Sequence, residues 1–327
     1  MAKSFKTPPQ DPVEIVVPRD RNKSVHKLKG FGPVYCINLD GQPDRWRYME
    51  EQFKYWELEN YERISAYDGR EDDLGHILKG KYPTTMSGGE VGCTTSHLKA
   101  IKHWLETSDS SYAIMIEDDC NLDIVQCWNF EWRDLVARFP YDWDIVQIAI
   151  ICTGDLHIKI HKRFVNEFST ACYVINRHHA EKLMRFHIRG NKYKLDNGVK
   201  PRPVADDLIY NSGNTYSIPL LSYKVELGAS IHPEHVGAFH VGNARGIEQF
   251  WTTNGSTFSI DELMDLNPYL GRTVENSAIQ EQIKQEDRDK WFREEMERRS
   301  APSYPVDDDK DDVESADETY RRFRSNN

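Results

Sequence analysis

Three acidic residues, Glu117, Asp118 and Asp119, directly follow the apolar run Ala113–Ile116. This run predicts a buried strand, so the three carboxylates would leave the core together at its end. Like charges at this spacing repel one another, and each loses hydration beside a core. A bound divalent cation would remove both costs, and Mg²⁺ or Mn²⁺ suits oxygen ligands and substrate phosphates. The alternative is that the acids only favour the start of a helix.

A second acidic pair, Asp206 and Asp207, follows Pro203 and begins a short apolar segment that predicts a helix. Either carboxylate can bind an acceptor hydroxyl and take its proton, which is the role of a general base. The alternative is that both residues cap or favour the start of that helix. The pattern does not choose between the two residues.

Two other segments have the residue types that bind phosphates. Asn38 ends a predicted strand, and Arg45 and Arg47 follow on the next predicted helix. An arginine there can bind a diphosphate through two hydrogen bonds or form an ordinary surface ion pair. Residues 87–97 place three glycines at the start of another helix, whose free N–H groups can bind an anion. This segment has neither the phosphate-loop nor the dinucleotide glycine pattern, so the alternative is a turn followed by a capped helix.

Three histidines, His232, His235 and His240, lie in a stretch interrupted by Gly and Pro. Such a stretch predicts a loop and lacks the helical spacing of many zinc sites. One of these histidines can complete a metal site, and surface histidines without a role are the alternative.

The segments that carry these residues alternate between strand and helix patterns. The predicted strands are 34–38, 61–66, 113–116 and 144–151, and the predicted helices are 43–56, 89–105 and 127–139. This alternation predicts an α/β fold with a mainly parallel, Rossmann-like sheet and helices on both faces. Ligands then bind beyond the carboxyl ends of the strands, which is where the acidic triplet lies.

Composition limits the class of protein. The chain has 327 residues and a formal charge of −11, from 42 Lys and Arg against 53 Asp and Glu. This acidic balance is atypical of proteins that bind the phosphate backbone, so we expect no nucleic-acid partner. No apolar run approaches the ~18 residues that cross a bilayer, and the six cysteines are predicted to be reduced and mostly buried. We therefore expect a cytoplasmic protein without a transmembrane segment.

The two ends of the chain differ in composition from the body. Residues 1–30 are rich in proline and charge and predict a flexible arm, with a docked extended segment as the alternative. Residues 271–300 predict a charge-dense helix with a thin apolar stripe, through which two copies can form a homodimer. Residues 301–327 contain an acidic run and predict a disordered tail.

Four motifs in order resemble glycosyltransferase family 25, which contains lipopolysaccharide galactosyltransferases and the catalytic modules of collagen hydroxylysine galactosyltransferases. They are Val34–Asp40 with Asp44 and Arg45, Ile64–Gly69, Gly89–His97 and Ala113–Asp119. A fifth segment, Pro203–Asp207, is similar to the family's later Pro-Val-Asp motif but has one residue more. The resemblance covers about residues 33 to 225.

This resemblance implies a GT-A type fold over residues 31–270, with a nucleotide-sugar half (31–150) and an acceptor half (151–270). It also implies a metal-dependent, inverting glycosyltransferase with Mn²⁺ or Mg²⁺ as cofactor. The donor would be a UDP-sugar that carries a hexose, galactose or glucose. The acceptor would be a hydroxyl of a glycan, a glycolipid or a protein.

The resemblance further implies a role for each candidate residue. Asp119 would be the main metal ligand, with Glu117 and His240 as further ligands, and Asp206 or Asp207 would be the base on the acceptor hydroxyl. Asp118 or Glu117 would contact ribose or metal-bound water. The residues expected at the nucleotide-sugar end are Asn38, Asp40, Arg45, Ala66, Asp68, Gly69, Ser96, His97 and Asp118. For Ser96 and His97, helix capping and core packing respectively are the alternatives.

Two other functions compete with this one. The chain could be a catalytically inactive module that binds a glycan or nucleotide, or another metal-dependent nucleotide enzyme such as a nucleotidyltransferase. Turnover of the donor with Mn²⁺ would exclude the first. Transfer of sugar, rather than of nucleotide or phosphate, would exclude the second.

Overall fold

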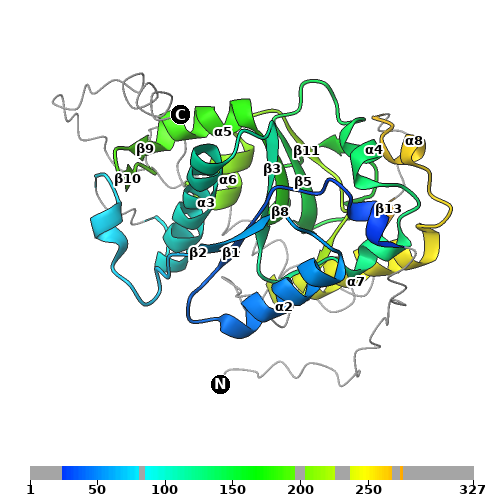
Figure 1. The fold of residues 1–327 in the computed structure, drawn as a ribbon, viewed down its shortest axis with the longest axis horizontal. Coiled ribbons are helices and arrows are strands. Elements are labelled where there is room, and N and C mark those ends of the chain that lie inside the picture. Colours follow the sequence, from blue (N-terminus) through cyan, green and yellow to red (C-terminus); the bar gives the residue numbers. More distant parts are fainter. Residues whose placement is uncertain (1–23, 81–84, 196–202, 225–235, 267–272, 275–327) are drawn as a thin grey trace.

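The centre of the molecule is a seven-stranded sheet (Figure 1). The computed structural model describes residues 24–80, 85–195, 203–224, 236–266 and 273–274, with the backbone alone for 236–239 and 273–274. From edge to edge the strands of the sheet are β2 (Tyr61–Ser65), β1 (Val34–Asn38), β3 (Tyr112–Glu117), β8 (Glu167–Asn176), β5 (Ile145–Cys152), β11 (Thr215–Ser217) and β7 (His161–Lys162).

The sheet is mostly parallel, as predicted, but it is mixed. β2, β1 and β3 pair in parallel, and so do β5 and β11. β8 lies between β3 and β5 and is antiparallel to both, while β7 is antiparallel to β11. The sequence patterns did not predict β8, although it joins the two halves of the sheet.

Helices cover both faces of the sheet, which confirms that part of the prediction. α3 (Gly88–Thr107), α5 (Arg177–His187) and α6 (Ala205–Tyr210) pack on one face, and α2 (Pro43–Tyr55), α4 (Trp132–Val136) and α7 (Val236–Asn254) pack on the other (Figure 1). Successive side chains of β1 point to opposite faces of the sheet. Val34 packs in the core on one face and Tyr35 in the core on the other.

Short elements complete the described fold. They are η1 (Val25–Leu28), η2 (Leu74–Ile77), η3 (Asp123–Cys127), α8 (Ile260–Leu263), and three strand pairs outside the main sheet: β4 (Cys120–Asn121) with β12 (Ser222–Tyr223), β9 (Ile188–Arg189) with β10 (Lys192–Tyr193), and β6 (Leu156–His157) with β13 (Thr273–Val274).

The predicted helix over 127–139 is wrong for most of its length, because only α4 is α-helical there. Trp128, Phe130 and Trp132 are all buried. Residues two apart lie on opposite sides of a helix, so a helix could not bury Phe130 together with the other two rings. The non-helical segment 128–131 and the first residue of α4 instead bury all three.

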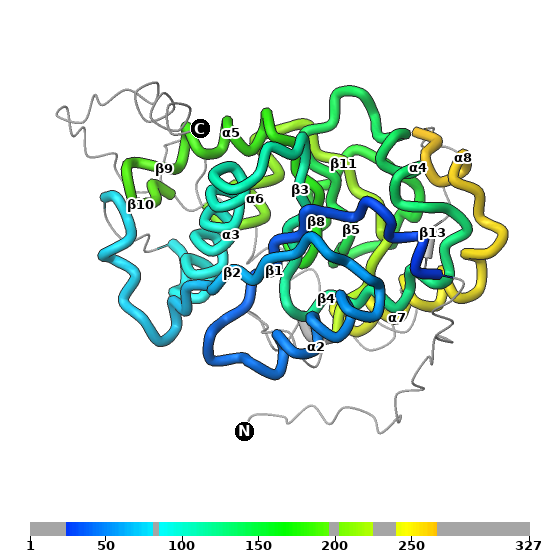
Figure 2. The backbone as a smooth tube through the Cα atoms, viewed as in Figure 1, coloured from blue at the N-terminus to red at the C-terminus, as the bar shows by residue number. Residues whose placement is uncertain are grey.

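The ends of the described chain also differ from expectation. Residues 24–30 were assigned to a flexible arm, but η1 (dark blue in Figure 2) packs beside α4 with Leu28 buried. Lys27 Nζ donates a 2.6 Å hydrogen bond to Gln126 O. Residues 1–23 and the acidic tail lie outside the described residues. Of the helix predicted over 271–300, only Thr273 and Val274 are described, and there the prediction is wrong because they form the strand β13.

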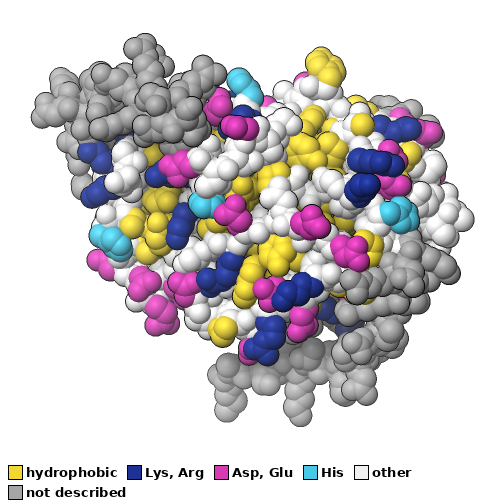
Figure 3. Space-filling model, in the orientation of Figure 1, with side chains coloured by type: hydrophobic (Ala, Val, Ile, Leu, Met, Phe, Trp, Pro, Cys, Tyr) yellow, Lys and Arg dark blue, Asp and Glu magenta, His cyan; other side chains and the backbone are white. Residues whose placement is uncertain are grey.

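All six cysteines lie in described segments, and all are free thiols. Four are buried, while Cys93 and Cys127 are partly exposed. Within the described segments, no helix has the length and apolar character needed to cross a membrane. On the face drawn in Figure 3, acidic and basic side chains are interspersed over the described residues.

Candidate active site

The acidic triplet lies where β1, β2 and β3 end side by side, because Asn38 pairs with Ser65 and Ile37 pairs with Glu117. Asn38 Nδ2 donates a 2.6 Å hydrogen bond to Asp118 Oδ2. Asn38 Oδ1 in turn accepts from Arg63 Nε at 2.7 Å. Asn38 therefore holds Asp118 at the edge of the sheet.

Arg45, from the first turn of α2, forms an ion pair with Asp118 and lies 3.4 Å from Asp119 Oδ2. Its side chain is only 13% exposed, whereas the neighbouring Arg47 is 65% exposed and pairs with Asp44 at the surface. Of the two predicted arginines, the structure brings only Arg45 to the acidic cluster. Both oxygens of Asp118 therefore have protein partners, Arg45 at Oδ1 and Asn38 at Oδ2.

Asp119 differs from its neighbours because its Oδ1 is buried and has no hydrogen-bond partner among the described residues, and the same holds for Arg45 Nε. Burial raises the pKa of Asp119 to about 8, and the adjacent Glu117 charge adds to the rise. Leaving a buried acceptor unpaired costs about 1–3 kcal/mol, so such a group usually has a ligand, ion or water as partner. An oxygen acceptor of this kind fits Mg²⁺ or Mn²⁺.

Glu117 is held by two donors. Its Oε1 lies 3.1 Å from His97 Nε2 and accepts a 2.7 Å hydrogen bond from Thr170 Oγ1. Burial alone would raise the pKa of Glu117, but these hydrogen bonds outweigh it and the pKa is lowered. His97 Nδ1 lies 3.1 Å from the Tyr173 hydroxyl. His97 is therefore both buried, as the packing alternative required, and in contact with the acidic cluster.

The segment after β2 is fixed against α3. Ser96 Oγ accepts from Tyr67 N at 2.8 Å and donates to Gly92 O at 2.6 Å. A Cβ on Gly92 would lie only 2.5 Å from Tyr67 O, which explains a glycine there. The capping role considered for Ser96 is wrong, because Ser87 and Glu90 form the capping box of α3.

The other residues predicted for the nucleotide end lie around this segment. Ala66 N donates to Asn38 O at 2.9 Å, and Asp68 accepts from Arg70. Gly69 packs so closely on the start of α3 that a Cβ would lie 2.0 Å from Gly88 O. Asp40 is 70% exposed and pairs with Arg63, so it lies at the rim of the cluster.

Asp206 and Asp207 begin α6 but neither caps it; the cap position is Val204, without a side-chain hydrogen bond. Asp206 Oδ1 accepts from Ser169 N at 2.5 Å, beside Thr170. Asp207 Oδ1 instead accepts from Asn211 Nδ2 at 3.0 Å, along its own helix. The structure thus brings Asp206 to β8, the strand that contacts Glu117.

The three comparisons with known proteins can be set against this geometry. Residues 31–130 match the model of glycosyltransferase family 25 (LPS biosynthesis protein). This confirms the resemblance for the four ordered motifs and supports a glycosyltransferase. No curated protein matches the chain significantly. Among solved structures, the crystal structure of A197 from STIV has a TM-score of 0.31 and 11% identity over 58% of this chain and 82% of that one, which is too weak to assign a fold.

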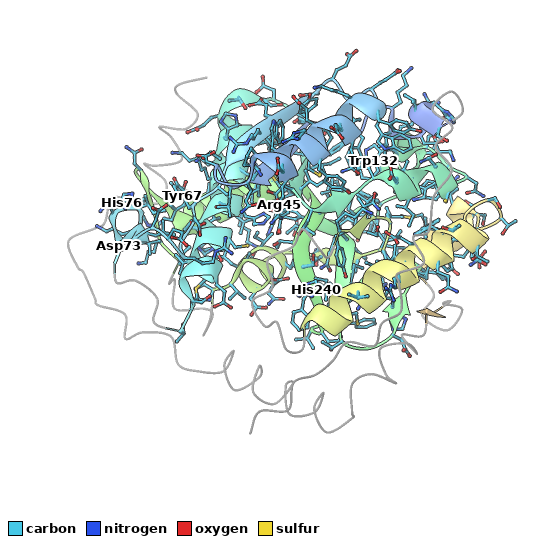
Figure 4. All side chains as sticks on the ribbon, turned by 90° about the horizontal axis from the view of Figure 1, so that it is seen from below. Arg45, Tyr67, Asp73, His76, Trp132 and His240 are labelled. Atoms are coloured by element: carbon cyan, nitrogen blue, oxygen red, sulfur yellow. The ribbon has the colours of Figure 1, made fainter. Side chains whose placement is uncertain are left out.

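The family 25 match ends at residue 130, before Asp206, Asp207 and His240. The placement of these residues therefore comes from the structure alone. His240 lies in the first turns of α7 and not in the predicted loop; Figure 4 shows it below Arg45 in that view. Its ring is 5.9 Å from that of Tyr223, and Lys224 N donates to Asp119 O. His232 and His235 lie outside the described residues.

Sequence reasoning missed Ser169 and Thr170, which connect the two acidic groups. Ser169 has a positive φ of 93°, which is rare for a residue with a side chain. The register between β5 and β8 shifts nearby, so this is a bulge. The available signal was the pair of hydroxyl residues before the apolar run 171–175.

Proposed function

We propose that this chain is a metal-dependent, inverting glycosyltransferase of the GT-A type that moves a hexose from a UDP-sugar to an acceptor hydroxyl. The observation that carries the proposal is the buried Oδ1 of Asp119, which has no hydrogen-bond partner within the described segments and lies at the carboxyl ends of parallel strands. The family 25 match over the same strands supports sugar transfer over other nucleotide chemistry.

Asp119 is the residue that would hold Mn²⁺ or Mg²⁺, with His240 as a further candidate from α7. A bound cation there would neutralise the negative charge that develops on a diphosphate leaving group. Arg45 would contribute a positive charge beside it, because the ion pair with Asp118 holds the guanidinium within 3.4 Å of Asp119 Oδ2. Asn38 and Arg45 together would keep Asp118 in place, where it could accept from ribose.

Asp206 is the proposed general base. An inverting transfer needs one base that takes the proton of the acceptor hydroxyl while the sugar leaves on the opposite side. Asp206 is partly exposed and fixed by the Ser169 amide, so one carboxylate oxygen has a defined position. β8 then joins the acceptor side to the donor side within one sheet, as a GT-A type fold requires.

The acceptor is proposed only by class: a glycan, a glycolipid or a protein hydroxyl. The description of the matched family favours a lipopolysaccharide-like glycan among these.

The decisive experiment offers the full chain a panel of UDP-hexoses with Mn²⁺ and sugar acceptors, and measures UDP release and glycosylated product. Asp119→Asn should lower transfer by at least roughly 100-fold, the scale of losing one key charge-stabilising group. Asp261→Asn, which changes an exposed carboxylate far along the chain, is the matched control. Full transfer by Asp119→Asn would reject the proposal.

A further inference from the structure

Beside the proposed donor site, three side chains of different chemistry converge. The Cys93 thiol, a ring nitrogen of His97 and a carboxylate oxygen of Glu117 all lie within 4.8 Å of one another. Cys93 and His97 are four residues apart on α3 and so face the same side of the helix. Glu117 reaches them from the end of β3.

Contacts with β8 fix the orientation of these side chains. His97 is 1% exposed, and the Tyr173 hydroxyl lies 3.1 Å from its Nδ1, which leaves Nε2 facing Glu117. Thr170 Oγ1 donates to Glu117 and lies 4.0 Å from Cys93 Sγ. Metal-binding histidines typically donate their second N–H to such an outer partner, which fixes the ring.

We propose that Cys93, His97 and Glu117 form a binding site for a thiophilic divalent cation such as Zn²⁺, separate from the Asp119 site. One sulfur, one nitrogen and one oxygen donor form a set that suits Zn²⁺. Mg²⁺ and Mn²⁺ prefer oxygen ligands, so the two sites differ in the ion they select. Three protein ligands leave a fourth position for water or a substrate oxygen.

The binding step is balanced by release of a proton. The Cys93 S–H bond is lost, the thiolate binds the cation, and the proton goes to solvent. His97 would bind through neutral Nε2 while its Nδ1–H donates to Tyr173. Without an ion, Nε2–H donates to Glu117 and the same three residues form only a hydrogen-bonded group, which is the outcome the experiment must distinguish.

The test is a titration of the full-length, metal-stripped protein with Co²⁺, a spectroscopic substitute for Zn²⁺. We expect one equivalent to produce a thiolate-to-cobalt charge-transfer band that Zn²⁺ removes by competition. Cys93→Ser should abolish the band and weaken Zn²⁺ binding by more than roughly 100-fold, beyond the loss typical of outer-shell changes. Cys127→Ser, at the other partly exposed cysteine, is the matched control and should keep the band.

A second measurement avoids dependence on variant folding. Zn²⁺ should slow alkylation of Cys93 in the unmodified protein, followed by mass spectrometry of its peptide, and leave Cys127 alkylation unchanged. Asp119→Asn should keep the cobalt band but lose Mn²⁺-dependent transfer. The two measurements therefore test the Cys93 site and the proposed function separately. The inference is overturned if the unmodified protein gives no thiolate band and no protection, or if the band persists in Cys93→Ser.

Discussion

Thr170 Oγ1 on β8 donates a 2.7 Å hydrogen bond to Glu117 Oε1 on β3. The residue before it, Ser169, donates its amide to Asp206 on α6. Two adjacent residues of one antiparallel strand thus connect the acidic end of β3 to the acidic start of α6. β8 therefore links the carboxylates of Glu117 and Asp206, which are far apart in the sequence.

The hydrogen bond between Ser169 and Asp206 predicts different roles for the two acids of α6, Asp206 and Asp207. Asp206→Asn should lower kcat by about 100-fold or more, because the base is lost, while donor binding stays nearly unchanged. Asp207→Asn should keep transfer within a few-fold, since Asp207 bonds to Asn211 on its own helix. Steady-state kinetics with saturating donor measure both. The opposite pattern would assign the base to Asp207.

Arg45 and Arg47 allow a largely buried ion pair to be compared with an exposed one on the same helix. Arg45→Ala leaves Asp118 buried without its counter-charge and should lower the free energy of unfolding by about 3 kcal/mol. Arg47→Ala removes an exposed pair and should cost less than about 1 kcal/mol. Urea unfolding of the metal-free proteins gives both values. Equal losses would contradict the burial of the Arg45–Asp118 pair.

The elements β1, α2 and β3 were predictable because the sequence patterns that specify them are local. The apolar run 34–38, the helical spacing of 43–56 and the run 113–116 each specify an element, and all three are present. Once these strands are assigned as parallel, Asn38 and Asp118 are expected at the same edge of the sheet, where the strands end. Helical spacing also favours Arg45 over Arg47 on the inward side, because Arg45 precedes the buried Met49 by four residues and Arg47 lies two residues away on the other side of α2.

The rest of the site depends on contacts between distant segments. β8 inserts between β3 and β5, and a local pattern does not state which strands it pairs with. The bulge at Ser169 is stabilised by Gln147 Nε2 and the Tyr210 hydroxyl, which both donate to Ser169 O. These donors come from β5 and α6, so the positions of Thr170 and Asp206 follow from tertiary structure alone.

Gly92 and Gly89 test the contact between α3 and the segment after β2. Gly92→Ala would place a Cβ 2.5 Å from Tyr67 O and 2.8 Å from Gly69 N, both backbone atoms. We expect a loss of about 1–3 kcal/mol in the free energy of unfolding, as for overpacking, together with weaker donor binding. Gly89→Ala has ordinary space around its Cβ and should be nearly neutral. Calorimetry measures the stability of both variants. A Gly92→Ala protein as stable as the unmodified one would show that the segment after β2 can move away from α3.

His161 and Glu167 should make stability depend on pH. His161 Nε2 lies 2.7 Å from Glu167 Oε1, and Glu167 is fully buried. Burial alone would lower the pKa of His161, but the Glu167 carboxylate outweighs it and the pKa is raised. A raised folded pKa stabilises the protein fully below about pH 6.5, the ordinary histidine value, and the gain is lost as pH rises through the folded value.

A double-mutant cycle with His161→Gln and Glu167→Gln isolates this effect, because it measures the coupling between the two side chains. The coupling free energy from urea unfolding should be largest near pH 6 and should shrink toward about pH 9, where the imidazole is neutral. The pH dependence should disappear from the Glu167→Gln background, since the carboxylate that favours the imidazolium is then absent. A coupling that stays constant over this range would mean that a neutral hydrogen bond, and not an ion pair, joins His161 to Glu167.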